Sequence, residues 1–321
     1  TQPCSSAASD VYKRQVRYGT MKENVIGLKV VMSDGRIIKT GSRARKSSAG
    51  YDLTKLIVGS EGTLGVITEL TLRLQGIPEE IASAICSFPD TASAVKTIIE
   101  TIQLGIPIAR SELMDSTSIE AVNEYSKLGL PIKEHLFFEF HGSATSVKEQ
   151  SETVQEIAAG NGGGDFHWST ATEDRNKLWK ARHNYYYAIK AKNPNHTFLV
   201  TDICVPISNL AEMIDQTAIE MKSKGIAPSI MGHVGDGNFH YGIMVRPNND
   251  DDINLAKDLT RSIVERALEL EGTCTGEHGV GIGKIEFMEK EHGEAYHVMS
   301  SIKRTFDPNG ILNPGKVVKI N

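Results

Sequence analysis

The sequence predicts an α+β fold. From residue 81 onward, short apolar runs typical of strands alternate with longer runs in which apolar residues recur at helical spacing. The connections are short and suit antiparallel neighbours, so we expect an antiparallel sheet with helices on one side. Before residue 78 the chain reads instead as strands joined by tight turns, with little helix.

Composition narrows the class of protein. The 321 residues suffice for one large or two ordinary domains, and 40% hydrophobic and 23% charged residues with a net charge of −5 are typical of a soluble globular protein. No basic surplus indicates nucleic-acid binding, and no 18-residue apolar run could span a membrane. The widely spaced Cys4, Cys86, Cys204 and Cys274 favour a reducing compartment over a disulfide framework or an iron–sulfur cluster.

Residues 1–15 do not resemble a native N-terminus. They are small and polar, lack periodicity and lack the apolar region of a signal peptide. Part of this stretch is similar to translated sequencing-adapter read-through, so we expect a non-native leader. Two domains are expected after it, residues 16–77 and residues 78–321, divided at Gly76, Ile77 and Pro78.

In the first domain, residues 25–32 and 36–39 are strand-like runs on either side of Asp34 and Gly35, which predicts a hairpin. A short helix is expected within residues 50–59, followed by a glycine turn and a strand at 66–72. Gly62 and Gly65 would let the backbone approach a ligand closely, although a glycine turn before a strand explains the same pattern. This is not a dinucleotide-binding glycine motif, because no helix follows it.

The second domain alternates strands and helices. The helix after residue 88 has its N-cap near Asp90. Arg182 and Tyr186 lie four residues apart on one predicted helix and so share a face; from the residues alone, Arg182 is either a solvent-facing arginine beside core aromatics or a functional group. The expected strands cover 81–88, 108–113, 135–141 and 197–204, and the expected helices 116–126, 146–159, 173–190, 209–224 and 250–271.

Two histidines flank a second hairpin. Asp236-Gly237 is a type I′ turn signal between two apolar runs, and counting outward from it pairs His233 directly with His240. Their Cβ atoms would then lie roughly 5 Å apart, close enough for both imidazoles to bind one cation. Glu277 is the candidate third ligand, which would leave an open position typical of catalytic zinc. A hydrogen-bonded turn without metal explains the histidines equally well.

Four ordered motifs carry a family resemblance. They are His233-Val-Gly-Asp-Gly-Asn-Phe-His240, the run Glu277-His278-Gly-Val-Gly, the ending that includes Asn313-Pro-Gly-Lys316, and the glycine segment from Gly59 to Ile67. Together they resemble the flavin-dependent D-2-hydroxy-acid dehydrogenases of the vanillyl-alcohol-oxidase group. This family includes cytochrome-type D-lactate dehydrogenase, the glycolate oxidase flavoprotein subunit and D-2-hydroxyglutarate dehydrogenase. The resemblance runs from about residue 16 to the C-terminus.

The resemblance implies a fold and a set of site residues. The fold would be the C-terminal portion of a PCMH-type FAD-binding domain followed by an antiparallel-sheet cap domain with ferredoxin-like halves, and the C-terminal tail would contact the flavin. Arg182 would bind the substrate carboxylate, Tyr186 would shape the pocket, and His278 would act as the base. A divalent metal, zinc or manganese, would be bound by His233, His240 and Glu277. The implied FAD contacts are Glu61, Gly62, Gly65, Ile67 and Asn313.

The implied activity is oxidation of a D-2-hydroxy acid by FAD, with electrons passed to a quinone, a cytochrome or another carrier. Gly242 stands where the hydroxyglutarate-type enzymes carry Asn, and a second carboxylate anchor is not evident. We therefore expect a small monocarboxylate substrate, D-lactate or glycolate, rather than a dicarboxylate.

Two alternatives remain open. The family's glycine-rich pyrophosphate loop would precede residue 16, so the chain could be a truncated, non-catalytic fragment that binds metal but not FAD. It could also be the flavoprotein subunit of a multi-subunit glycolate oxidase. A zinc hydrolase is disfavoured because neither His-Glu-x-x-His nor a nucleophile elbow is present. The expected location is cytoplasmic, peripheral to the inner membrane, with the mitochondrial matrix as the alternative.

Overall fold

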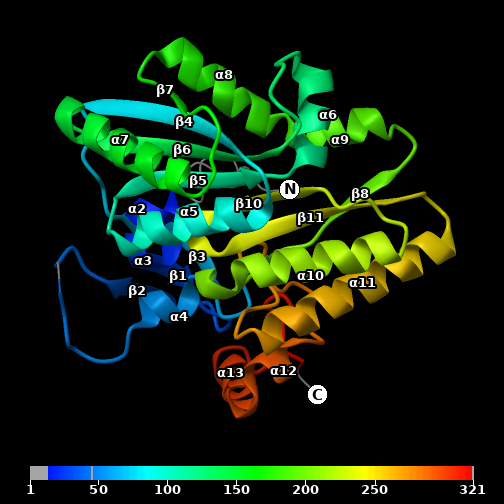
Figure 1. The fold of residues 1–321 in the computed structure, drawn as a ribbon. Helices are drawn as coiled ribbons and strands as arrows, with labels where there is room; N and C mark the ends of the chain where they lie inside the picture. Colours follow the sequence, from blue (N-terminus) through cyan, green and yellow to red (C-terminus); the bar gives the residue numbers. More distant parts are fainter. Residues whose placement is uncertain (1–13, 45, 320–321) are drawn as a thin grey trace. The chain divides into compact units, whose positions relative to one another are not determined.

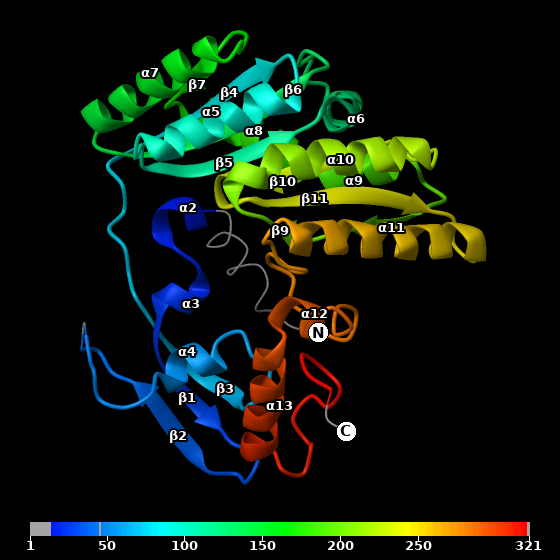
Figure 2. The ribbon, with the colours of Figure 1, turned by 60° about the horizontal axis from the view of Figure 1, so that its bottom comes forward.

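The computed structural model describes residues 14–44 and 46–319, which form two compact units. One unit contains Tyr18–Gly76 and Glu277–Asn321; the other contains Ile77–Gly276 and the short segment before Tyr18 (Figures 1 and 2). The first boundary lies between Gly76 and Ile77, within the Gly76-Ile77-Pro78 segment where the sequence predicted it. Residues 277–321 group with the N-terminal strands, whereas the sequence prediction kept them with the second domain. Each unit is described separately below.

The first unit is built on a three-stranded antiparallel sheet. Its strands are β1 (Val25–Val31), β2 (Ile37–Gly41) and β3 (Val66–Leu72), in the order β2-β1-β3. The predicted hairpin around Asp34 and Gly35 is therefore confirmed. Val25, Leu28 and Val30 form a small core with Ile57 from helix α4 (Leu53–Ile57). The short helix α3 (Met21–Asn24) precedes β1 in this unit, whereas α2 (Gln15–Tyr18) lies almost wholly in the segment grouped with the second unit.

The C-terminal segment joins this unit through one buried lysine. Helices α12 (Met288–His292) and α13 (Glu294–Phe306) lead to Lys303, whose side chain is 2% exposed. Its Nζ donates to the carbonyl oxygens of Thr63 and Leu312, at 2.8 and 2.7 Å, and to the carboxylate of Asp307. The tail is thereby fastened to the glycine segment that precedes β3.

The second unit contains one eight-stranded antiparallel sheet. The strand order is β7-β4-β6-β5-β10-β11-β8, and β9 also pairs with β11. The strands are β4 (Glu80–Phe88), β5 (Ile108–Met114), β6 (Glu134–Gly142), β7 (His167–Ser169), β8 (Thr197–Val200), β9 (Ile203–Cys204), β10 (Ile230–His233) and β11 (Asn238–Val245).

Helices cover both faces of this sheet, which corrects the prediction of a single helical layer (Figures 1 and 2). One face packs against α5 (Thr91–Gln103), α7 (Ala144–Gly160), α10 (Leu210–Ser223) and α11 (Asp250–Glu269). The other packs against α6 (Ser116–Ser126), α8 (Thr172–His183) and α9 (Tyr185–Lys192). Strand β5 is buried at every residue, which requires a cover on both sides. Asp90 caps α5 as expected, accepting from the Ser93 amide.

Two predicted elements are interrupted. The helix expected over residues 173–190 divides into α8 and α9 at Asn184, whose side chain donates to Ser126 Oγ. The strand expected over residues 197–204 breaks at Thr201 and Asp202 into β8 and β9. Both breaks matter for the site, because Arg182 and Tyr186 fall on different helices and Asp202 falls in the gap between strands.

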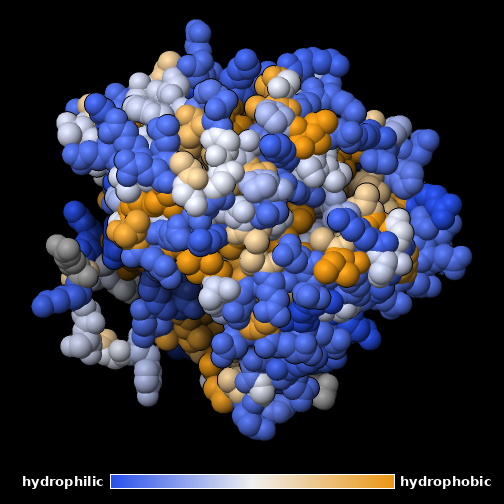
Figure 3. Space-filling model, viewed as in Figure 1, coloured by the Kyte–Doolittle hydropathy of each residue, from blue (hydrophilic) through white to orange (hydrophobic). Residues whose placement is uncertain are grey.

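Most of the face drawn in Figure 3 carries hydrophilic residues, with apolar side chains showing in smaller patches. Within the described residues, no helix combines the length and apolarity needed to cross a membrane. Cys86, Cys204 and Cys274 have free thiols, and Cys4 lies outside the described residues.

Candidate functional site

The second unit brings His233 and His240 together, but not in the predicted register. The hairpin pairs His233 with Asn238 and Met231 with His240, so the two histidines are diagonal neighbours on one face. The cause is the turn: residues Val234–Asp236 form a 3₁₀ turn closed by Gly237 at φ 76°, a loop two residues longer than the predicted one. The two ring centroids lie 5.8 Å apart.

The orientation of both imidazoles suits a metal site. His233 Nδ1 lies 2.8 Å from Glu112 Oε1, and His240 Nδ1 lies 3.0 Å from the carbonyl oxygen of Thr201. Each acceptor places the proton on Nδ1, so Nε2 carries the lone pair that can bind a cation. Both rings are buried, with His233 7% and His240 2% exposed. Two buried imidazoles of this tautomer are a donor pair of the kind that binds a divalent metal. In the second unit, however, the group of possible ligands around His240 includes Asp202 and not His233.

Arg182 is buried rather than solvent-facing, and its partner is Glu112. Its Nε and Nη2 lie 3.1 and 3.0 Å from Glu112 Oε2. The other carboxylate oxygen of Glu112 accepts from Arg110 Nε at 2.9 Å as well as contacting His233. One fully buried carboxylate thus joins the predicted carboxylate-binding arginine to a predicted metal ligand.

A larger charge cluster surrounds Glu112. On the adjacent strand β6, Glu139 accepts from Arg14 at 2.6 Å and lies 2.8 Å from His141. Burial by itself raises the pKa of Glu112, but the charges of Arg182, His233 and Arg110 hold it well below its usual value.

Tyr186 does not share a face with Arg182. The helix break at Asn184 leaves Tyr186 47% exposed, while Arg182 is 7% exposed. The Tyr186 ring packs edge-on against Tyr187 and Phe198, at 5.6 Å from each centroid. The prediction that one continuous helix carries both residues is therefore wrong.

Asp202 lies next to the histidine hairpin. Its Oδ1 is 3.9 Å from His240 Nδ1 and accepts from Asn238 Nδ2 at 2.9 Å. Gly276, the last residue of this unit, packs so closely here that an added Cβ would lie 1.9 Å from Asn238 Nδ2. The Oδ1 atom of Asn238 is buried and has no hydrogen-bond partner among the described residues.

Glu277 and His278 open the C-terminal part of the first unit. His278 Nε2 lies 3.1 Å from Glu277 Oε1, and the His278 side chain is 53% exposed. Ligand atoms of these two residues lie within 4.8 Å of each other, as do those of Asp202 and His240 in the second unit.

The segment predicted to contact the flavin, from Glu61 to Ile67, is held by several hydrogen bonds and close contacts within the first unit. The Glu61 carboxylate accepts hydrogen bonds from the backbone amides of Val280 and Gly281, at 2.7 and 2.8 Å. The backbone carbonyl oxygen of Glu61 accepts one from Asn313 Nδ2 at 2.5 Å. A Cβ on Gly62 would lie 2.8 Å from Asn313 Nδ2, and one on Gly65 would lie 2.5 Å from Val30 Cγ1. Packing within the chain thus accounts for both glycines.

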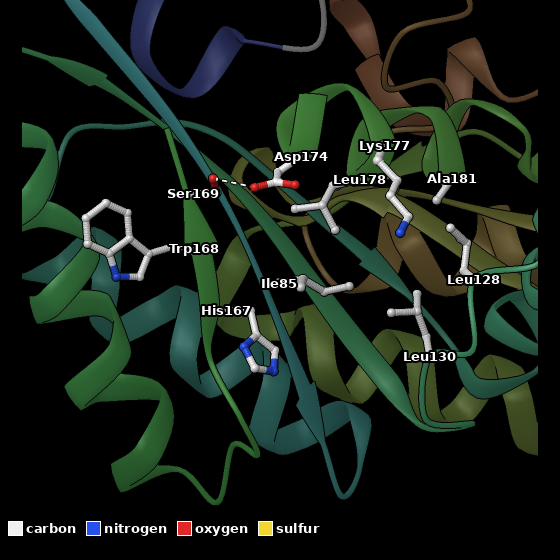
Figure 4. Close-up of a pocket in the computed structure, with 10 residues that line it drawn as sticks. All are labelled: Ile85, Leu128, Leu130, His167, Trp168, Ser169, Asp174, Lys177, Leu178 and Ala181. Atoms are coloured by element: carbon white, nitrogen blue, oxygen red, sulfur yellow. Dashed lines mark hydrogen bonds between the residues drawn. The ribbon is translucent and has the colours of Figure 1, made fainter. Parts of the chain in front are cut away.

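A separate cavity of about 350 Å³ lies in the second unit between β4, β7 and α8 (Figure 4). Apolar side chains line much of it, with Lys177 and Asp174 contributed by α8 and His167 by β7. None of the predicted site residues lines this cavity.

Sequence reasoning missed Glu112, Arg110 and Asp202. The signal for the first two was present, because Arg110 and Glu112 are opposite charges two apart in a predicted strand and so lie on one face. Asp202 was hidden inside an apparently continuous strand.

Comparison with known proteins identifies the family. A family model described as FAD linked oxidases, C-terminal domain, matches residues 77–317. The chain belongs to this family. The predicted resemblance is therefore confirmed.

Relatives of this FAD linked oxidase chain extend over nearly all of it. It is 47% identical to a protein named probable D-lactate dehydrogenase, mitochondrial, from Danio rerio, covering 99% of the chain and 65% of the relative. It is 47% identical to D-lactate dehydrogenase [cytochrome], mitochondrial, from Arabidopsis thaliana, covering 94% and 54%. Glycolate oxidase subunit GlcD of Bacillus subtilis is 34% identical, covering 95% and 65%. The chain thus spans between half and two thirds of the length of these relatives.

The solved structure of p-cresol methylhydroxylase shows the same fold, with a TM-score of 0.70 at 14% identity over 96% of this chain and 68% of that chain. This confirms the predicted PCMH-type architecture with an antiparallel sheet.

Proposed function

We propose that this protein oxidises a small D-2-hydroxy acid, D-lactate or glycolate, to the 2-oxo acid with FAD as the electron acceptor. Family membership and the names of the relatives support the reaction class. The observation that carries the proposal is the fully buried Glu112, which joins Arg182 to His233. This arrangement supplies a group for the substrate carboxylate beside a group for a cation.

Arg182 is the proposed carboxylate anchor. Glu112 occupies its Nε and Nη2 edge, so the substrate would be bound through Nη1. The monocarboxylate preference rests on Gly242, which stands where the hydroxyglutarate-type enzymes carry Asn. Tyr186 is retained only as a residue that could line the entrance, since it is half exposed.

His233, His240 and Glu277 are the proposed metal ligands. The sequence motifs support this set, and in the second unit both imidazoles hold their Nδ1 atoms against oxygen acceptors. A bound divalent ion, zinc or manganese, would lower the pKa of the substrate hydroxyl. His278 would take the hydroxyl proton on a ring nitrogen, and the nearby Glu277 carboxylate can stabilise the resulting imidazolium.

The segment from Glu61 to Ile67, together with Asn313, is the proposed flavin contact. The Glu61 carboxylate fixes the start of this segment by hydrogen bonds from the amides of Val280 and Gly281. Ile67 at its end is 39% exposed and so accessible to a ligand. Bound FAD would accept the hydride released from C2 of the substrate.

The names of the relatives support proposals for the electron acceptor, the assembly and the location. The Arabidopsis name supports a cytochrome as electron acceptor, with a quinone or another carrier as alternatives. The Bacillus name supports the second candidate, a flavoprotein subunit of a glycolate oxidase complex. The mitochondrial relatives favour the mitochondrial matrix over the cytoplasmic location first expected.

The test is a paired measurement on the purified chain: the flavin absorption spectrum after adding FAD, and the metal content. His233→Ala removes a proposed ligand, and His135→Ala is the matched control because His135 is equally buried but contacts the Lys133 carbonyl. Bound FAD that bleaches with D-lactate, and metal lost only in His233→Ala, would support the proposal. Metal without flavin would favour the metal-binding fragment, and binding of neither would overturn the site.

A further inference from the structure

Glu112 contacts both Arg182 and His233 in the second unit, but it is itself neither a proposed metal ligand nor a proposed substrate ligand. It is 0% exposed at the middle of β5, yet it meets charged or polar side chains from three elements. Arg110 lies on the same strand, Arg182 on α8 and His233 on β10. Burying a carboxylate is costly unless its oxygens are paired, and here both oxygens of Glu112 have partners.

We propose that Glu112 is the positioning residue of the site: it sets the tautomer and direction of His233 and the orientation of Arg182. Metal binding and substrate binding then both depend on this one carboxylate. This inference rests on the proposed function.

For His233, the geometry determines which nitrogen carries the proton. Glu112 Oε1 lies 2.8 Å from Nδ1, and an ionised carboxylate can only accept a hydrogen bond. The proton is therefore held on Nδ1 and the lone pair on Nε2. A glutamine at this position could turn its amide NH₂ toward Nδ1, which would move the proton to Nε2 and block metal binding there.

For Arg182, the same carboxylate fixes the plane of the guanidinium. Two nitrogens on one edge, Nε and Nη2, contact Glu112 Oε2 at 3.1 and 3.0 Å. A planar group held along one edge has no remaining rotational freedom, so its opposite edge has a defined direction. Loss of Glu112 would leave Arg182 charged, buried and free to reorient.

Glu139 provides a matched control. It is also a buried carboxylate, 3% exposed, on the adjacent strand of the same sheet face. Its partners are Arg14 and His141, neither of which is a proposed metal or substrate ligand. Glu139→Gln therefore removes one buried charge from the same cluster without touching His233 or Arg182.

The experiment compares Glu112→Gln, Glu139→Gln and His233→Ala with the unaltered chain. Zinc affinity is measured by competition with a chromophoric chelator, and D-lactate affinity by calorimetry on the zinc-loaded chain without FAD. We expect Glu112→Gln to weaken zinc binding by about 10–100-fold and to weaken D-lactate binding as well, while Glu139→Gln changes neither. The absorption spectrum of the Co²⁺-loaded chain should change in Glu112→Gln, because His233 leaves or reorients, and in His233→Ala, which lacks that ligand, but not in Glu139→Gln.

A second variant guards against misfolding. The double substitution Arg110→Met with Glu112→Gln removes the Arg110–Glu112 ion pair and so leaves the net charge of the cluster unchanged, while Arg182 still loses its carboxylate partner. It should show the same loss of zinc affinity. If both Glu112 variants bind zinc like the unaltered chain while His233→Ala does not, the role of Glu112 is overturned and the proposed function stands. If the unaltered chain binds no zinc, the proposed metal site itself fails.

Discussion

Gly237→Ala tests why the histidine hairpin has its observed register. Gly237 has φ 76°, and an added Cβ would lie 2.1 Å from the carbonyl oxygen of Val205. Gly225 provides the comparison, because it has φ 73° but no atom within 4 Å of an added Cβ. The two substitutions share the left-handed backbone strain, and Gly237→Ala adds the clash at a buried position.

The magnitudes follow from these two terms. An alanine in the left-handed conformation costs about 1–2 kcal/mol, which is the whole effect expected for Gly225→Ala. At Gly237 the clash is with backbone, which cannot move aside easily, and overpacking of this kind adds about 1–3 kcal/mol. Gly237→Ala should therefore destabilise the second unit by clearly more than Gly225→Ala.

Urea denaturation followed by tryptophan fluorescence is the assay. Trp168 and Trp179 are the two tryptophans of the chain and both lie in the second unit, so the signal reports that unit alone. Gly237→Ala should also weaken zinc binding, because the turn holds both histidines, whereas Gly225→Ala should not. Equal losses of stability in the two variants would refute the role assigned to the close approach.

Two further predictions concern buried charges. Lys303→Met removes the cation that pairs with the buried Asp307, and it should lower the free energy of unfolding of the first unit by about 3–5 kcal/mol. The measurement is amide hydrogen exchange at residues 60–65, which should become faster. Unchanged exchange at these residues would contradict the prediction. Burial raises the pKa of Asp115 from 3.8 to about 6, so the folded chain holds the carboxyl proton more tightly than the unfolded chain does. The stability that the protonated carboxyl contributes is therefore fully present below pH 3.8 and is lost as pH rises through 6. Asp115→Asn should match the unaltered chain at pH 4 and be more stable at pH 8 by up to about 3 kcal/mol, in thermal denaturation at both pH values; an equal effect at both would contradict it.

The order and type of most elements could be predicted from the sequence. Apolar periodicity located β4, β6 and α5, and the Asp90 cap of α5 was placed at the correct residue. These features are local, since they depend on side chains within one or two turns of each other. The interruptions at Asn184 and Asp202 were missed because the apolar pattern continues across both.

The site was predicted in composition but not in geometry. The motifs identified His233, His240 and Arg182, and the structure brings these three residues to one face of the same sheet. Sequence spacing placed the histidines directly opposite each other, and the 3₁₀ turn made them diagonal instead. Register depends on how the turn closes against Val205, a contact distant in sequence.

The sequence by itself determined the family, the strands and helices, and the residue types that could bind a cation and a carboxylate. Only the tertiary structure decided that Glu112 joins Arg182 to His233 across 70 and 121 residues of chain. The physical reason is that a buried carboxylate is stable only where several cationic or donor groups converge on it. That convergence arises from packing α8 and β10 against β5, and no local pattern encodes it.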